Sequence, residues 1–357
     1  MRPQRILGAH ISASGGLEAL LKNAHATGPY ARCFAFFIRP RMTWKPFPPF
    51  SSEIASGFRK NLQSSGQFCL NHVAVHGSYL INLASHNPEL RAKSVELMTE
   101  EVSKCEQLGI PHYVFHPGSC TGHTFVRAKK RSRNEEEARI NESLEESLRT
   151  QSKRFVAESV QEVLSRTSQV ALVLENTAGQ GNCIGADLNE LREILDSVEM
   201  LWHQDEQKRS PERLGICLDT CHLFASGTCI DKDGKDLFLE TSEGAYEALW
   251  RLIFDSIGAQ WMHRNVLKVV HLNDSKAPAA SRKDQHANIG KGYIPIEFFQ
   301  WIMQSDHFKE IPMILETPRK KARRKRTPNK VEKAAVSEVE HPSAEEEIDL
   351  LLSWSEK

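Results

Sequence analysis

Short apolar runs alternate with longer amphipathic stretches along this 357-residue chain. Between the runs, apolar residues recur at helical spacing, for example from Leu90 through Leu97 and Val102 to Leu108. Near-continuous apolar strands separated by helices are typical of a parallel sheet that is covered on both sides. Eight runs have this character: RILGAHIS, RCFAFFIR, NHVAVHGS, HYVFHPGS, VALVLENT, GICLDT, VLKVVHLND and PMILETP. Eight such units predict an α/β fold of the (β/α)8 TIM-barrel type, which typically needs about 250 residues.

The remaining length falls in polar, charged segments, which we interpret as insertions in a single domain covering 1–357. They lie at about 123–138, 201–213, 228–240 and 319–345. The last begins with the basic run RKKARRKR (319–326), continues into an acidic stretch, and is followed by the apolar sequence IDLLLSW. This order predicts a solvated loop before a final amphipathic helix that closes the barrel.

Overall charge and composition exclude several classes of protein. Lys and Arg together number 46, as do Asp and Glu, so no global positive field attracts nucleic acid and any such binding needs a local patch. No apolar run approaches the length needed to span a membrane, and we expect no membrane partner. The eight scattered cysteines favour reduced, mostly buried thiols, as in the cytosol or nucleus.

A polar or ionisable side chain follows the apolar core of every predicted strand. In a TIM barrel these strand ends meet on one face, where active sites of this fold are built. Burying so many such groups unpaired would cost several kcal/mol each, and divalent metal ions would compensate. The residues are His10, Arg39, His76, His116, Glu175, Asp219 with His222, His271 and Glu316, joined by the pair Asp284-x-His286 beyond the seventh strand.

The kinds of side chain in this set limit which metal ions can bind there. Imidazole and carboxylate ligands without thiolate favour zinc, with manganese or iron as rivals, whereas magnesium and calcium prefer shells of oxygen alone. At three to four ligands per ion, this set predicts more than one ion, and as many as three if carboxylates are shared.

Seven sequence segments, in order, resemble the endonuclease IV family of zinc-dependent apurinic/apyrimidinic endonucleases. They are GAHISASGG, HGSYLINLAS, FHPGS, LENTAGQG, CLDTCHLFASG, HLNDSK with DQHANIGKG, and ILET. The resemblance implies three zinc ions per chain. Its ligand sets are His76, His116 and Glu175 for the first zinc, Glu175, Asp219, His271 and Glu316 for the second, and His222, Asp284 and His286 for the third.

The resemblance also implies an activity. The expected reaction is hydrolysis of the phosphodiester 5′ to an abasic site in double-stranded DNA, leaving a 3′-hydroxyl and a 5′-deoxyribose phosphate. Cleaning of blocked 3′ ends is expected as well. Glu175 or Glu316 would orient or deprotonate the attacking water.

We expect the protein to be a monomer located in the nucleus, with the cytoplasm or mitochondria as alternative locations. We interpret the basic run 319–326 as a nuclear import signal or a clamp on DNA phosphates.

The DNA-contacting residues follow the family pattern less closely. Tyr79 matches a residue that inserts into the duplex beside the abasic nucleotide. The family usually has an arginine two residues before the tryptophan of the second loop, where this chain has Met42. Arg41 and Arg39 lie close by in sequence, and we expect Tyr79 and Arg41 to contact DNA.

Two other functions compete with this interpretation. A sugar isomerase would use the same barrel with two divalent ions, but the third set of candidate ligands, His222, Asp284 and His286, argues against it. A barrel that binds DNA without cutting it is the other alternative, and the intact ligand set argues against that. Metal content separates the candidates: about three zinc ions per chain against two magnesium or manganese ions.

Overall fold

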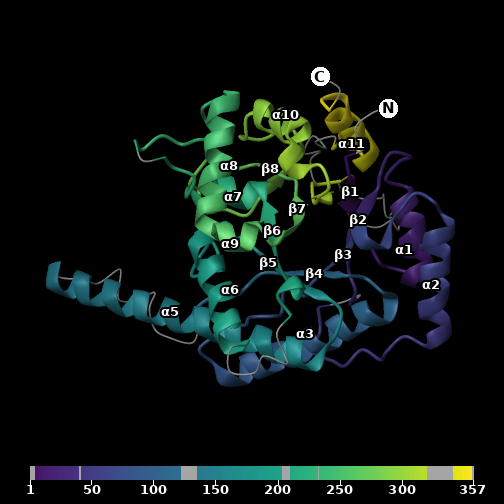
Figure 1. Cartoon of the computed structure of the whole chain (residues 1–357), viewed down its shortest axis with the longest axis horizontal. Coiled ribbons are helices and arrows are strands. Elements are labelled where there is room, and N and C mark those ends of the chain that lie inside the picture. Colours follow the sequence, from purple (N-terminus) through teal and green to yellow (C-terminus); the bar gives the residue numbers. More distant parts are fainter. Residues whose placement is uncertain are drawn as a thin grey trace, which may run out of the picture.

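Eight parallel strands close into a barrel in the computed structural model, which describes residues 5–39, 42–121, 135–202, 210–231, 233–319 and 341–355 (Figure 1). The barrel order follows the chain order, and β10 closes the circle against β1. All eight predicted strands are therefore confirmed. They are β1 (Leu7–His10), β2 (Cys33–Phe37), β3 (Val73–His76), β4 (His112–Phe115), β5 (Ala171–Glu175), β6 (Leu214–Asp219), β7 (Leu267–His271) and β10 (Met313–Leu315).

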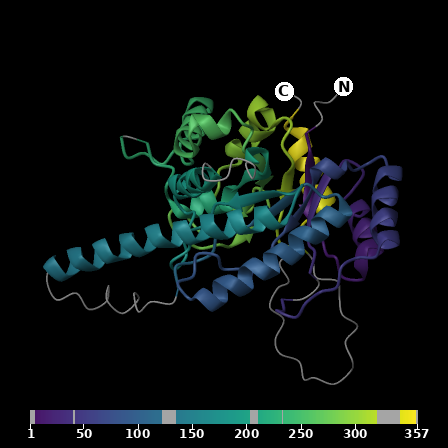
Figure 2. The same ribbon diagram turned by 60° about the horizontal axis from the view of Figure 1, so that its bottom comes forward.

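Helices surround the barrel, and α3 and α5 run alongside one another, with one end of α5 projecting beyond the barrel (Figure 2). Their ends follow local signals: α3 begins after Asn87, whose side chain accepts from two backbone N–H groups, and ends at Gly109 in the left-handed region. The helices are α1 (Gly16–His25), α2 (Ser52–Ser64), α3 (Pro88–Leu108), α5 (Glu135–Arg166), α6 (Leu188–Trp202), α7 (Thr220–Ser226), α8 (Glu243–Ile257), α9 (Ala259–Met262), α10 (Ile296–Gln304) and α11 (Ala344–Ser353).

Some of the polar segments predicted as insertions overlap the ends of helices in the structure. Helix α5 already begins at Glu135, so the end of the segment 123–138 is helical rather than loop. Helix α6 extends to Trp202, and α11 confirms the predicted closing helix, packing against α10 and β1. Most of the first segment, residues 203–209 of the second and residues 320–340 of the last lie outside the described residues.

The barrel interior is a small apolar cluster, separate from the larger core between strands and helices. It consists of Ile6, Cys33, Ala35, Ala74, Val114, Ala171, Val173, Cys217, Val269 and Ile314. Because side chains alternate along a strand, the residue two positions after an inward-facing one also faces inward. Because Ala74, Val173 and Cys217 face the interior, the residues two positions later also face it: His76, Glu175 and Asp219. The same step gives His116, His271 and Glu316, so the polar residues form the next layer at the carboxyl end of the barrel.

A two-stranded hairpin above β7 was not predicted from the sequence. It pairs β8 (Asp274–Ser275) with β9 (His286–Ala287). Asp274 is buried and accepts hydrogen bonds from the backbone N–H groups of Gly292 (2.8 Å) and Ile294 (3.1 Å). A Cβ atom at Gly292 would lie 2.3 Å from Asp274 Oδ1, so only glycine allows this close approach. The hairpin and this anchor fix the loop that carries Asp284 and His286.

All eight cysteines are free thiols, and six of them are buried, which agrees with the reduced thiols expected from the sequence. Across the part of the chain that the structure describes, no helix combines the length and apolar character needed to cross a bilayer.

Candidate metal centre

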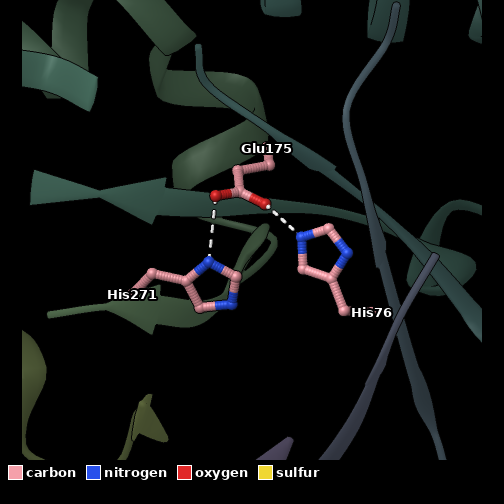
Figure 3. Close-up of side chains that lie close together, drawn as sticks. All are labelled: His76, Glu175 and His271. Atoms are coloured by element: carbon pink, nitrogen blue, oxygen red, sulfur yellow. Dashed lines mark hydrogen bonds and ion pairs between the residues drawn. The ribbon is translucent and has the colours of Figure 1, made fainter. Parts of the chain in front are cut away.

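Glu175 lies at the centre of the cluster of polar residues and is completely buried. Its Oε2 atom is 3.2 Å from His76 Nε2 and 3.3 Å from His116 Nε2. Its Oε1 atom is 2.9 Å from His271 Nδ1, so the carboxylate lies between imidazoles on both sides (Figure 3). These contacts join the end of β5 to the ends of β3, β4 and β7.

A second group shares Glu175 with Asp219, His271 and Glu316. One potential ligand atom from each of these four residues lies within 4.8 Å of the others. Glu316 Oε2 is 3.4 Å from His271 Nδ1. Three carboxylates and one imidazole thus converge from four strands, a donor set that suits a divalent cation.

The third group lies toward the hairpin. Asp284 Oδ1 is 3.1 Å from His222 Nε2 and 3.3 Å from His286 Nε2. His222 reaches this position because Asp219 ends β6 and also caps α7, accepting a 2.8 Å hydrogen bond from the His222 backbone N–H. Asp219 also lies close to this group, since its Oδ2 atom is 3.5 Å from His286 Nε2, and one potential ligand atom each from Asp219, His222 and His286 lies within 4.8 Å of the others. All nine sequence-predicted ligands come together on this face.

Hydrogen bonds to backbone carbonyls orient three of the imidazoles. The Nδ1 atoms of His76 and His222 lie 2.9 Å from the carbonyl oxygens of Gly77 and Asn176, and that of His286 lies 3.4 Å from the carbonyl of Glu316. A carbonyl can only accept, so Nδ1 carries the proton and Nε2 presents its lone pair to the cluster. Metal-binding histidines in proteins are held in this way.

The cluster holds more negative than positive charge when its imidazoles are neutral. Burial lowers the pKa of His222, but Asp219, Asp284 and Glu175 outweigh burial and raise that pKa to about 10. For Glu316, burial favours the neutral acid, but His271 and His76 lower the pKa to about 2. Against burial, the neighbouring imidazoles likewise lower the pKa of Glu175 and of Asp284. The negative charge of these carboxylates must be balanced by cations, either protons on the imidazoles or metal ions.

Unsatisfied nitrogen atoms show that the residues fit metal ions. The buried Nε2 atoms of His116, His222 and His286 face the cluster and have no hydrogen-bond partner of suitable geometry among the described residues. Buried polar atoms are rarely left in this state unless a ligand completes them. The Cys217 thiol in the barrel interior offers no alternative ligand, because burial raises its pKa to about 12 and keeps it protonated.

Two asparagines that the sequence analysis did not single out position the predicted ligands Asp219 and Glu316. Asn176 binds the backbone of Asp219 in both directions, accepting from its N–H at 2.7 Å and donating to its carbonyl at 3.2 Å. Asn273 donates to Asp219 Oδ2 at 2.6 Å and accepts from the Glu316 backbone N–H at 2.8 Å. Asn176 follows the predicted ligand Glu175 directly, and Asn273 follows the predicted ligand His271 by two residues. An asparagine just after a predicted ligand at a buried strand end is therefore the sequence signal for this role.

The residues expected to contact DNA have different surroundings. Tyr79 is 58% exposed, and its ring lies 5.4 Å from that of His76 and 6.0 Å from that of His116. Met42 is 69% exposed, whereas Arg41 lies outside the described residues. Arg39 is buried and forms ion pairs with Glu100 (2.7 Å) and Glu101 (3.2 Å), so it is not available to replace the missing arginine.

Comparisons with known proteins agree with this geometry. Residues 21–341 match a family model described as a xylose isomerase-like TIM barrel. The chain is 37% identical to a probable endonuclease 4 of Chlorobium phaeovibrioides over 87% of its own length and 93% of that protein. This chain belongs to the endonuclease IV family. It is also 36% identical to an apurinic-apyrimidinic endonuclease of Caenorhabditis elegans, over 88% of its own length and 66% of the worm protein.

Solved structures show the same relationship. Endonuclease IV from Thermus thermophilus superposes with a TM-score of 0.64 at 25% identity, covering 98% of both chains. D-psicose 3-epimerase from Clostridium cellulolyticum superposes with a TM-score of 0.54 at 14% identity, covering 99% of this chain and 98% of the epimerase. The second likeness shows the shared barrel alone, so the sugar-isomerase alternative gains no support beyond the fold.

Proposed function

We propose that this chain is a zinc-dependent endonuclease that hydrolyses the phosphodiester 5′ to an abasic site in double-stranded DNA. The products are a 3′-hydroxyl and a 5′-deoxyribose phosphate, and the same site removes blocking groups from 3′ ends. The observation that supports this most strongly is the convergence of nine imidazole and carboxylate residues in three connected groups on the carboxyl face of the barrel. Membership of the endonuclease IV family supplies the substrate class.

Three zinc ions would be held by the three groups: His76, His116 and Glu175; Glu175, Asp219, His271 and Glu316; and His222, Asp284 and His286. When bound, such ions lower the pKa of water to about 7 and neutralise charge on phosphate oxygens. Glu175 has one oxygen toward each of the first two groups, which is the arrangement of a bridging carboxylate.

The chain's own residues position the reactants. Glu316 is only partly buried and lies beside Glu175 at the edge of the cavity, so its carboxylate can accept a proton from the attacking water. A cavity of about 310 Å³ opens directly above the third group and is lined by Tyr79, His116, Glu316 and Pro318 among others. A nucleotide must leave the base stack to enter it, and Tyr79 stands at its wall where it can fill the gap left in the duplex.

Replacing Glu175 by glutamine tests the assignment. The substitution keeps the volume of the side chain but removes the charge that two metal groups share. We expect cleavage of an abasic-site duplex to fall by at least about a thousandfold while the circular dichroism spectrum stays unchanged. A folded, metal-loaded Glu175→Gln protein with near-normal turnover would contradict the proposal.

Metal content separates this proposal from the isomerase alternative. Mass spectrometry of the purified native protein should give about three zinc ions per chain. The substitution Asp284→Gln should remove one of the three and leave the other two, because Asp284 contacts only the third group. Two magnesium or manganese ions per chain, unaffected by Asp284→Gln, would favour sugar isomerisation.

A further inference from the structure

Two buried nitrogen atoms on the metal face remain unexplained by the metal centre. The described residues contain ten buried side-chain polar atoms without a hydrogen-bond partner, and six of them are on this face. Three are the Nε2 atoms of His116, His222 and His286, which metal ions would complete, and a fourth, His271 Nε2, lies on the side of its ring that faces away from Glu175 and Glu316, beside the Cys217 thiol. The other two are His10 Nε2 and Arg319 Nη2.

Both of these residues line one cavity of about 610 Å³ beside the metal centre, here called the β1–β3 cavity. It lies between the loops that follow β1, β2 and β3 and the segment after β10. Phe37 and Met42 form apolar parts of its wall, and Ser12 and Ser14 add hydroxyl groups. His76 and Tyr79 line this cavity and also the cavity above the metal ligands, so the two spaces are neighbours.

The positions of the two side chains follow from the fold. His10 continues the inward-facing series of β1 after Ile6 and Gly8, and its ring packs 4.7 Å from that of Phe37. Arg319 follows Glu316 by three residues and returns toward the β1 loop. Arg39 also lines the cavity, but its guanidinium forms ion pairs with Glu100 and Glu101. Arg319 is attracted by the carboxylate of Glu347, but its Nη2 atom has no hydrogen-bond partner among the described residues.

We propose that the β1–β3 cavity is a phosphate subsite for the DNA strand, in which Arg319 and His10 bind a phosphate that flanks the scissile one. The guanidinium of Arg319 can bind phosphate oxygens through its planar edge. His10 Nε2, as a second nitrogen donor, and the hydroxyl groups of Ser12 and Ser14 complete such a site. The inference rests on the proposed function, because it places the scissile phosphate at the metal centre next door. It assigns to Arg319 a substrate-binding role and no part in the chemical step.

Substitution of Arg319 by glutamine tests this role. With an abasic-site duplex, KM should rise about tenfold with kcat unchanged, since Arg319 binds the flanking phosphate equally in the ground state and the transition state. Binding of the nicked product duplex, followed by anisotropy, should show a log–log salt slope that is shallower by about 0.9, as expected for one phosphate contact. Arg319→Lys should give an intermediate KM, because charge remains without the planar fork.

The matched control is Arg166→Gln. Arg166 ends α5, away from the cavity, and pairs with Glu96, so the variant removes the same charge elsewhere and should keep the wild-type KM and salt slope. A double variant, Arg319→Gln with His10→Leu, should lose less affinity than the product of the two single effects, because both residues bind one phosphate.

The outcomes distinguish this inference from the proposed function. If the wild type fails to cut abasic DNA, the proposed function is wrong, whatever Arg319 does in the binding assay. If the wild type cuts and Arg319→Gln has the KM and salt slope of the wild type, the subsite is wrong and the proposed function stands. A lower kcat at unchanged KM would also overturn the subsite.

Discussion

Tyr79 is 58% exposed although its ring packs against the imidazoles of His76 and His116. A tyrosine that served only to pack a loop would be covered. Its ring also packs against that of Phe37 at a centroid distance of 5.2 Å, and Tyr79 lines both cavities. The exposed ring is therefore available to stack on a base.

We expect Tyr79→Ala to weaken binding of an abasic duplex by about tenfold or more, because base–aromatic stacking contributes roughly 1–3 kcal/mol. Met42→Ala should have a smaller effect, since a thioether offers less stacking surface, although both side chains are exposed on the same rim. Anisotropy measurements with the two variants make the comparison. Wild-type binding and cleavage by Tyr79→Ala would remove the residue from the DNA interface.

Several of the predicted metal ligands could be singled out from the sequence because each follows the apolar core of a strand, where alternation places it on the inner face of the barrel. Once the apolar run of a strand is known, the residue that faces inward at its end is fixed, as at His76, Glu175 and Asp219. The residues that hold these ligands could not be assigned in the same way. Asn176 and Asn273 act through backbone groups of other strands, and no local pattern shows which backbone lies opposite an amide.

Helix α11 connects to the metal centre through one buried carboxylate, Glu347. It accepts hydrogen bonds from Thr317 Oγ1 (2.5 Å), Asn288 Nδ2 (3.1 Å) and the Ile289 backbone N–H (2.9 Å). Thr317 follows Glu316, and Asn288 lies two residues after His286. The closing helix thus holds the loops that carry two of the predicted ligands.

We expect Glu347→Ala to lower the free energy of unfolding by about 3 kcal/mol, because three buried donors are left without their acceptor. Urea denaturation measures the change. The matched control is Glu345→Ala in the same turn of α11, where the side chain is exposed and the change should stay below about 1 kcal/mol. Equal midpoints for the two variants would show that Glu347 does not hold these loops.

Elements differed in how well the sequence predicted them. The eight strands and α11 were predicted because each has a clear apolar pattern with one periodicity. The β8–β9 hairpin was not, because its strands have two residues each and depend on Asp274 binding the distant Gly292 and Ile294. The start of α5 at Glu135 was also missed, since a highly charged helical turn resembles a loop in composition.

The whole molecule has no net charge, so its attraction to DNA must come from the local distribution of charge. On the metal face, the cluster itself carries an excess of carboxylates over fixed positive charges, and Arg39 forms ion pairs with two glutamates. Lys and Arg are instead concentrated at 319–326, where seven of eight residues are basic. Apart from Arg319, this run lies outside the described residues, and its role stays a prediction from sequence.

Deletion of residues 320–330, which keeps Arg319, addresses that role. None of the nine predicted ligands is removed, so the cleavage rate at saturating DNA should stay within about twofold of the wild type. We propose that the run directs import into the nucleus, because a dense basic cluster is the usual signal for it. A fluorescent fusion of the full chain should then be nuclear, and the deletion should move it to the cytoplasm.

If the run also binds phosphates, the salt slope of DNA binding should become shallower by about 0.9 for each phosphate that is no longer bound, in addition to the Arg319 contribution. A fusion whose location is unchanged by the deletion would exclude the import role, and an unchanged salt slope would exclude the phosphate clamp.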